Sequence, residues 1–333
     1  MGGDATNWDE SAYRASIAKE RELQARTVFR TIFAPSQNPI PETIVAASSD
    51  GSVAPYSISS CISSSPPAHL YDIRHQKVSS ASIVAEPRCL LQGHDGPAYD
   101  VKFYGQGEDS LLLSCGDDGR IQGWRWKEIL NSDLTHASHM RGNHLMSVLD
   151  LVNPQHRGPW GALSPTPENN AIAVDDQIIT GSEDGTVRMW DCKSGKCTYV
   201  INPQKNVKLK AASSWISCIA LDINENWLAF STDKSISIWN LPTRECISMI
   251  GTHSLVQDIL FEDNQILAVG AEPALSHFNL NGAILSQVQC APQSAFSISR
   301  HPSGVMAVGG YGGLVDVISQ FGSHLCTFRC GGC

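Results

Sequence analysis

A few short stretches of this 333-residue sequence carry side chains that could do chemistry. His136, His139 and His144 could hold a zinc ion, because imidazole is a common zinc ligand. Their spacing matches neither a four-ligand finger nor a His-Glu-x-x-His helix, so we interpret them as loop histidines. Cys330 and Cys333 have the spacing of a metal-binding pair, but the sequence has no second pair of this kind. We therefore predict no metal site.

Two other groups of residues offer thiols or positive charge. Cys192 and Cys197 flank a turn, and we interpret them as core or edge thiols rather than a redox pair. Lys205, Lys208 and Lys210 could touch RNA phosphates or an acidic partner, although three lysines are more typical of a solvated loop. The sequence contains no phosphate-binding loop and no nucleophile elbow. We therefore predict no catalytic residue, no cofactor, and contact with RNA at most through partner proteins.

Composition narrows the class of protein. Lys and Arg number 24 against 33 Asp and Glu, and the formal charge of -9 argues against a nucleic-acid-binding protein. Hydrophobic residues at 42% allow a sizeable core, while charged residues at 17% suit a β-rich chain better than a helical bundle. No apolar run reaches the ~20 residues of a membrane helix, and the first residues lack a signal core, so we expect neither membrane contact nor secretion. The 11 cysteines are then expected to be reduced thiols of the cytosol or nucleus.

A pattern of strand, turn and strand repeats along the chain and must position the residues named above. Residues 178–191, IITGSEDGTVRMWD, read as a strand, an acidic-glycine turn and a second strand. The frame recurs six times, with turn positions at Asp50, Asp118, Asp184, Asp233, Glu272 and Gly312. Six residues after each turn position stands a large apolar residue: Tyr56, Trp124, Trp190, Trp239, Phe278 and Ile318. The last three turn positions are 39 and 40 residues apart, close to the ~40–45-residue period of a propeller blade. We therefore predict an all-β fold, a β-propeller with six discernible repeats.

Within this frame the conspicuous side chains have structural roles. We expect Trp124, Trp190 and Trp239 to lie in the core, where they pack blade against blade. His94 follows a glycine ahead of the second repeat, and we expect it to hydrogen-bond to the turn acid Asp118. These residues therefore support the fold rather than a reaction.

The segments that flank or interrupt the repeats divide the chain. Residues 9–26 favour a short helix that leans on the propeller. Residues 57–84 are rich in Ser, and much of this segment is predicted to form an exposed, mobile loop. Residues 324–329 can supply the outer strand of the last blade. We divide the chain into an N-terminal helical extension, a propeller and a frayed tail: residues 1–26, 27–329 and 330–333.

Residues 181–197, GSEDGTVRMWDCKSGKC, resemble a WD-repeat unit. Longer stretches, residues 153–172, 268–276 and 309–328, resemble the family of THO complex subunit six in its plant form. The resemblance implies a nuclear protein, because the THO complex is the core of the assembly that couples transcription to messenger-RNA packaging and export. It also implies that the other THO subunits are partners and that the propeller is a non-catalytic scaffold.

The chain departs from this family in its number of repeats. Members are usually described as seven-bladed, whereas six repeats are discernible here. At residues 171–180 the piece NAIAV would belong to one repeat and QIITGS to the next, with the intervening unit gone. A ring without one blade must close again with six blades or stay open with an exposed sheet face.

Two alternatives to a scaffold remain open. Residues 190–193, Trp-Asp-Cys-Lys, resemble the box of WD-repeat substrate receptors of cullin-4 RING ubiquitin ligases, with Lys193 in place of the preferred Arg. This resemblance implies a ligase adaptor that contacts Trp190, Asp191 and Lys193, in plant hormone signalling and alongside the THO role. The other alternative is an enzyme that uses the central channel, which would require several polar or acidic side chains to converge on the channel mouth.

Overall fold

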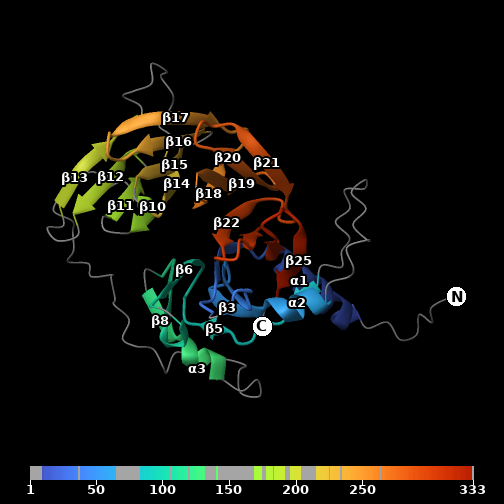
Figure 1. Cartoon of the computed structure of the whole chain (residues 1–333). Coiled ribbons are helices and arrows are strands. Elements are labelled where there is room, and N and C mark those ends of the chain that lie inside the picture. The colour runs from blue at the N-terminus through green and yellow to red at the C-terminus, as the bar shows by residue number, and fades with distance from the viewer. Residues whose placement is uncertain are drawn as a thin grey trace.

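The computed structural model describes residues 10–36, 38–64, 83–105, 107–118, 121–131, 140–141, 169–174, 178–182, 184–191, 196–203, 215–224, 226–232, 235–262 and 264–331. In this part of the chain six β-sheets follow one another around an arc, with their first strands toward its centre (Figure 1). The prediction of an all-β propeller with six repeats and a short N-terminal helix is therefore confirmed.

We number the sheets as blades 1 to 6 in chain order. Blade 1 consists of β1 (Val28–Phe33), β2 (Thr43–Ser48), β3 (Ser52–Ser57), β5 (Leu91–Gln92) and β9 (Met140–Arg141). Blade 2 consists of β6 (Ala98–Tyr104), β7 (Leu111–Gly116) and β8 (Ile121–Arg125). Blade 3 consists of β10 (Asn169–Val174), β11 (Ile178–Ser182), β12 (Val187–Asp191) and β13 (Lys196–Ile201).

The remaining three blades follow without long interruptions. Blade 4 consists of β14 (Ile216–Leu221), β15 (Trp227–Thr232), β16 (Ser235–Asn240) and β17 (Glu245–Gly251). Blade 5 consists of β18 (Val256–Glu262), β19 (Gln265–Gly270), β20 (Ala274–Asn279) and β21 (Ile284–Gln289). Blade 6 consists of β22 (Ala295–Arg300), β23 (Met306–Gly310), β24 (Leu314–Ile318), β25 (His324–Cys330) and β4 (Ile83–Ala85), the last pairing parallel to β25.

Turn acids shape the hairpins through bonds to their own neighbours. In blade 1 the Asp50 carboxylate accepts hydrogen bonds from Ser52 N at 3.2 Å and Ser52 Oγ at 2.6 Å. In blade 3 the Asp184 carboxylate accepts the same two bonds from Thr186, at 2.9 and 2.6 Å. The glycines that follow these two acids have φ of 80° and 74°, a conformation that glycine adopts without strain. Because this geometry is local, the turns are recognisable in the sequence.

Five hydrophobic clusters hold the blades together, and each joins two neighbours. They link blade 2 to 1, 1 to 6, 6 to 5, 5 to 4, and 4 to 3. Among the described residues no cluster links blade 2 to blade 3, and no described sheet lies between them (Figure 1). In the described part of the chain, the hydrophobic contacts therefore join five of the six pairs of neighbouring blades.

The large residues at the repeat ends follow this order of contacts. Five of them are buried in the cluster that their blade shares with the blade before it: Tyr56, Trp124, Trp239, Phe278 and Ile318. Trp190 of blade 3 is only half-buried, and its indole Nε1 donates to Thr180 Oγ1 at 2.9 Å. Trp190 is thus not buried as the prediction of a core position requires, and none of the hydrophobic clusters of the described residues includes it.

Blade 3 contains residues 171–180, where we placed the missing unit. β10 pairs antiparallel with β11, so that Ile172 lies opposite Thr180 and Ala173 opposite Ile179. The two pieces that we assigned to different repeats are thus neighbours in one sheet, and residues 175–177 between them lie outside the described part. This pairing covers an edge of β11 that would otherwise be open.

The N-terminal helix forms, but its contact with the propeller differs from the prediction. α1 (Glu10–Ala25) covers most of residues 9–26. None of its described side chains is buried, and Ile17 alone among them is half-buried. The packing expected of a helix that leans on the propeller is therefore not found in these side chains.

Two further segments are more ordered than we predicted. Residues 58–64 fold as α2 (Ile58–Ser64) instead of an exposed loop, and Ile58 and Cys61 are buried in the cluster between blades 1 and 6. Residues 65–82 lie outside the described part. β25 forms as predicted but ends at Cys330, which is fully buried, and Gly331 N donates to Ala85 O at 3.0 Å. Cys330 and Gly331 are therefore not part of a frayed tail.

Candidate functional site

His94, which precedes the first strand of blade 2, makes the hydrogen bond that we predicted from the sequence. His94 Nδ1 lies 2.9 Å from Asp118 Oδ1, as expected, and the His94 side chain is fully buried. Nε2 of the same ring lies 2.7 Å from Ser114 Oγ on β7. Ser114 was not identified from the sequence, although a serine on the strand just before a turn acid is a signal that could have found it. The three side chains tie the loop before β6 to the hairpin of β7 and β8.

Of the Trp-Asp-Cys-Lys segment that resembles the ligase-receptor box, residues 190–193, the structure describes only the first two residues. Trp190 and Asp191 end strand β12, where Asp191 lies opposite Lys196. In the turn before this strand, hydrogen bonds from Thr186 and Arg188 lower the pKa of Asp184, although its partial burial alone would raise it. Lys193 lies outside the described part, so the contact of Trp190, Asp191 and Lys193 with a ligase adaptor stays a prediction.

Several other residues singled out in the sequence also lie outside the described part: Asp233, Cys192, His136, His139, His144, Lys205, Lys208 and Lys210. Elsewhere, no group of three or more His, Cys, Asp or Glu side chains in the described ranges is arranged to hold a metal ion. The helices that the structure describes include none long and apolar enough to cross a membrane.

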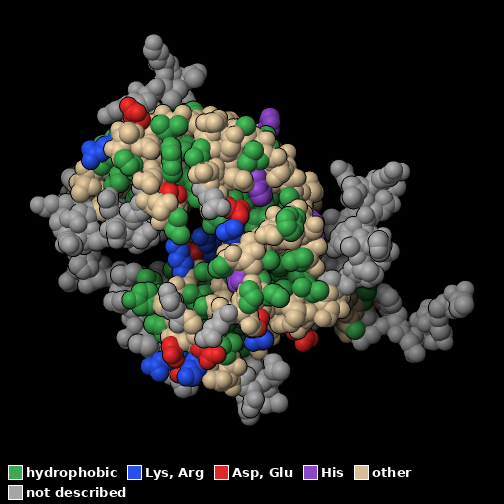
Figure 2. Space-filling model, viewed as in Figure 1, with side chains coloured by type: hydrophobic (Ala, Val, Ile, Leu, Met, Phe, Trp, Pro, Cys, Tyr) green, Lys and Arg blue, Asp and Glu red, His purple; other side chains and the backbone are tan. Residues whose placement is uncertain are grey.

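Charged side chains converge on the channel from three inner strands. Arg30 Nη1 on β1 donates to Asp258 Oδ2 on β18 at 2.7 Å, and Arg30 Nε lies 3.1 Å from Asp100 Oδ1 on β6. Figure 2 shows basic and acidic side chains round the hollow in the middle of the arc. The negative charge of Asp258 raises the pKa of Arg30 further above its usual value. The guanidinium therefore stays charged and links blades 1, 2 and 5.

The buried carboxylate of this group is saturated with donors. Asp258 accepts hydrogen bonds from Ile298 N at 2.9 Å and Ile259 N at 3.0 Å besides that from Arg30. Burial raises the pKa of Asp258, while Arg30 and the two amides lower it. The convergence that a channel enzyme would require is thus present, but these groups bind one another.

A thiol beside this group is poorly suited to act as a nucleophile. Cys218 on β14 is buried, and its Sγ lies 3.1 Å from Ser231 Oγ. Burial, reinforced by the charge of Asp258, raises the pKa of Cys218 to about 12. Since the thiolate is the reactive form, Cys218 is inert near neutral pH.

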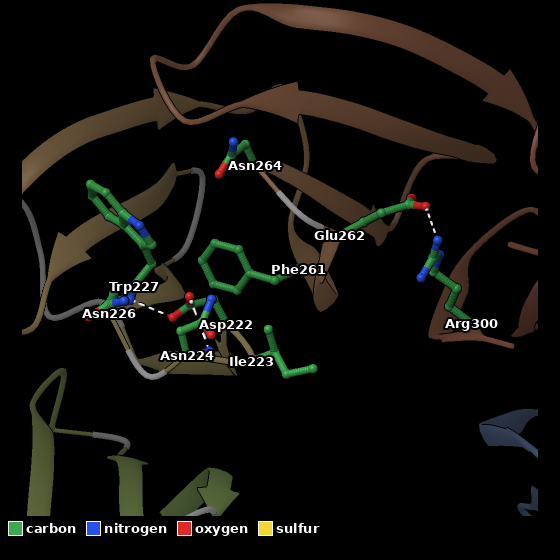
Figure 3. A pocket seen from close by; sticks show the side chains of 9 residues that line it. All are labelled: Asp222, Ile223, Asn224, Asn226, Trp227, Phe261, Glu262, Asn264 and Arg300. Atoms are coloured by element: carbon green, nitrogen blue, oxygen red, sulfur yellow. Dashed lines mark hydrogen bonds and ion pairs between the residues drawn. The ribbon is translucent and has the colours of Figure 1, made fainter. Parts of the chain in front are cut away.

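A pocket of about 380 Å³ lies at the end of the channel where the inner strands finish (Figure 3). Trp227 and Phe261 supply its aromatic lining, and Glu262 pairs with Arg300 at 2.6 Å. Its other lining residues come from the turns after β14 and β18: Asp222, Ile223, Asn224, Asn226 and Asn264. Ile223 is 92% exposed. The small volume and exposed apolar rim suit a side chain of a protein partner better than a large cofactor.

The sequence did not point to this pocket. The Asp222 carboxylate accepts from Trp227 N at 2.6 Å and Asn224 N at 3.4 Å, which shapes the turn between β14 and β15. An Asp followed two residues later by Asn is a turn signal, but it does not predict that Phe261 of the next blade lies opposite Trp227.

Comparisons with known proteins identify both the repeat and the whole chain. The family model of the WD domain, G-beta repeat, matches residues 156–191 and 203–240. THO complex subunit 6 of Arabidopsis thaliana is 50% identical and is matched over 99% of each chain. The THO complex subunit 6 homolog of Danio rerio is 24% identical over 87% of this chain and 94% of its own length. THO complex subunit 6 of Homo sapiens is 22% identical over 88% and 90%.

The alignment with the Arabidopsis protein also bears on the missing unit. It is 376 positions long, which exceeds the 333 residues of this chain by 43. At least 43 positions therefore hold a residue of the relative and none of this chain. That number corresponds to about one blade.

Proposed function

This chain belongs to the THO complex subunit 6 family, and from that premise we propose that it is a non-catalytic scaffold of the THO complex in the nucleus. In this role it binds other THO subunits and takes part in messenger-RNA processing and export. Contact with RNA is made through those partners, since the chain has a formal charge of -9.

The observation that carries the proposal is the 50% identity over nearly the whole length of both chains. A match confined to the repeat pattern would support only the fold, because unrelated proteins share propellers. A match along the full chain also includes the exposed loops and turns, and these are the surfaces with which a propeller binds partners.

The geometry of the channel favours a scaffold over an enzyme. Arg30, Asp100 and Asp258 are paired with one another, and burial keeps the Cys218 thiol protonated. No charged group of this set is left to transfer a proton to a substrate. The pocket between Trp227 and Phe261 offers a protein partner a place to insert a side chain.

Affinity purification from nuclear extract, followed by mass spectrometry, tests the proposal. We expect the tagged chain to recover several THO subunits in stoichiometric amounts. A Trp239→Ala variant, which loses a buried side chain between blades 3 and 4, is the control for recovery that depends on the fold. Recovery of other proteins without any THO subunit would contradict the proposed role.

The ligase-receptor alternative has no support in the described contacts or in the relatives named above. It stays a prediction that depends on Trp190, Asp191 and Lys193. The first two end strand β12 beside the open part of the arc.

A further inference from the structure

Each inner strand of the arc has a β-bulge close to its start, and a bulge takes a side chain out of the regular alternation of the strand. In blades 3, 4 and 5 the residues at the bulge are polar or small: Asn170, Ser217, Cys218 and Gln257. In blades 1, 2 and 6 they are aromatic: Phe29, Tyr99 and Phe296. Because blades 2, 1 and 6 are neighbours, the aromatic residues lie together on one side of the channel.

These three aromatic residues form one surface, which we call the aromatic platform. The ring centroids of Phe29 and Tyr99 are 5.2 Å apart, and those of Phe29 and Phe296 are 5.8 Å apart with the rings nearly perpendicular. Such tilted and edge-to-face contacts fix the rings relative to one another. Tyr99 is nevertheless 46% exposed, and the two phenylalanines are half-buried. The platform thus holds a rigid apolar surface in water, which is typical of a binding site.

The platform and the pocket occupy opposite ends of the channel. The aromatic residues are each second in their strand, whereas Glu262 and Arg300 of the pocket are the last residues of β18 and β22. The inner strands run in the same direction around the arc, so the two sites can bind different segments at once.

Negative charge is in excess beside the platform. Tyr99 Oη donates to Asp117 Oδ1 at 3.3 Å. Next to Phe29 and Tyr99 in sequence, Arg30 faces the carboxylates of both Asp100 and Asp258. One guanidinium cannot neutralise two carboxylates. A phosphate-bearing ligand would be repelled here, and a cationic one attracted.

We propose that the aromatic platform docks an extended segment of a partner protein that carries an arginine next to an apolar side chain. The arginine stacks on the exposed ring of Tyr99 and directs its guanidinium to Asp117, while the apolar neighbour covers Phe29 and Phe296. Arginine fits better than lysine, because its planar group stacks on a ring and pairs with a carboxylate through two bonds. The proposal rests on the proposed scaffold function, since it specifies the chemistry of one partner segment.

The test uses the purified full chain and a fluorescent probe peptide with blocked ends, Gly-Ser-Phe-Arg-Phe-Ser-Gly. The control probe has Glu in place of Arg. We expect saturable binding of the Arg probe and at least about tenfold weaker binding of the Glu probe, measured by fluorescence anisotropy. Raising the salt concentration should weaken binding of the Arg probe. No saturable binding of the Arg probe up to about 1 mM, or equal binding of both probes, would overturn the proposal.

Substitutions of two tyrosines on β6 distinguish a loss of binding at the aromatic platform from a general effect on the fold. Tyr99→Ala should weaken binding of the Arg probe at least about tenfold, whereas Tyr99→Phe, which keeps the ring, should stay within about threefold. Tyr104→Ala is the matched control, because Tyr104 is 70% exposed at the other end of β6. Equal losses in Tyr99→Ala and Tyr104→Ala would contradict docking at the platform.

A second pair of variants tests the charge. Asp117→Asn should weaken binding of the Arg probe several-fold, and Asp109→Asn, with a side chain 89% exposed elsewhere on blade 2, should not. Tyr99-dependent binding of a short oligouridylate in place of the Arg probe would identify a base-stacking surface and overturn the proposal. These measurements need no THO subunit, so they can fail while THO subunits are still recovered from nuclear extract, and the reverse.

Discussion

Blades 1 and 6 meet where the first and last strands of the propeller come together, whereas no hydrophobic cluster of the described residues joins the consecutive blades 2 and 3. At the closed seam, Arg26 Nη1 donates to Gly331 O at 2.7 Å and to Cys330 O at 3.3 Å. Arg26 Nη2 lies 2.5 Å from Asp50 Oδ2, and Tyr56 Oη donates to Gly331 O at 3.4 Å. A buried arginine thus ties the first strand of the propeller to the last.

We call the facing sides of blades 2 and 3 the open seam. Both sides carry apolar side chains that in the other pairs of blades are buried against a neighbour. On β7, Leu112 is buried toward blade 1, while Leu111 and Leu113 on the other face are only half-buried. Trp190 of blade 3 is half-buried as well. Each closed seam brings a large residue of one blade against the face of the blade before it. In the residues that the structure describes, both partners are present here but share no hydrophobic cluster.

The comparison of the two seams teaches that contact between neighbouring blades depends on the spacing of the blades more than on the type of their repeat-end residues. The repeat-end residue of blade 3 is a tryptophan like those of blades 2 and 4, yet its environment differs. We predict that a unit of about one blade, the length of the shortfall of at least 43 positions against the Arabidopsis relative, would restore the usual environment of this tryptophan.

Restoring the missing unit should have the largest effect. Insertion of the corresponding segment of the Arabidopsis relative between Val174 and Gln177 should close the arc and bury Trp190. Because Trp190 is already half-buried, completing its burial should add about 2–3 kcal/mol, so we expect Tm to rise by about 5 °C and aggregation to fall. Differential scanning calorimetry and light scattering measure both. A Gly-Ser segment of the same length is the control, and equal Tm values of all three chains would show that the arc gains nothing from the unit.

The second-largest effect is expected from replacing a repeat-end tryptophan with alanine, and its size should differ between a closed and an open seam. Trp239→Ala should lower the free energy of unfolding by about 3–5 kcal/mol, because Trp239 is buried between blades 3 and 4. Trp190→Ala should lower it by only about 1–2 kcal/mol, since less apolar surface is buried. Chemical denaturation measures both. With the missing unit inserted, the effect of Trp190→Ala should rise to that of Trp239→Ala, and an unchanged small effect would refute the role of the open seam.

Arg26→Met should weaken the closed seam. It leaves the carbonyl groups of Cys330 and Gly331 without their charged donor, and Arg26 is only 6% exposed. We expect a loss of about 2–3 kcal/mol in the free energy of unfolding. Arg14→Met is the matched control, because its pair with Glu10 has side chains 77% and 66% exposed and should contribute under about 0.5 kcal/mol. Similar losses in both variants would argue against closure by Arg26.

The closed seam should also respond to pH. Burial lowers the pKa of His301, whose ring lies 5.6 Å from that of Phe33 in blade 1. The unfolded chain then takes up this proton before the folded chain does, so stability falls as pH decreases from about 6.5 toward the lower pKa of the folded state. His301→Gln should therefore reduce the drop in Tm between pH 7.5 and pH 5.5. Exposed His253 gives the control variant His253→Gln, and a drop as steep in His301→Gln as in the wild type would exclude this contribution.

The smallest effect on stability is expected at Lys193, beyond the end of β12. Lys193→Glu and Lys193→Arg should both change the free energy of unfolding by less than about 0.5 kcal/mol. If this end of blade 3 docks a ligase adaptor, the Glu variant should lose co-precipitation of the adaptor and the Arg variant should keep it. Recovery of THO subunits should be unchanged. Adaptor binding retained by a folded Lys193→Glu variant would leave the scaffold role alone.

The repeat frame was predictable because its signals are local. A turn acid bonds to the residue two positions later, and a glycine next to it takes a positive φ, as at Asp50 and Asp184. The bond of His94 to Asp118 joins elements of one blade and was predictable for the same reason. The pocket was not, because Trp227 and Phe261 belong to different blades and no local pattern relates them.

The sequence by itself determined the fold class and the family, since both depend on residue order alone, and it predicts the place of a missing blade. Only the tertiary structure decided that Trp190 is half-buried, that residues 58–64 form a helix over blade 6, and that Arg26 binds the last residues of the propeller. Each of these depends on which surface lies opposite. In a ring of blades that surface is supplied by a neighbour in space, and a sequence pattern within one blade does not specify it.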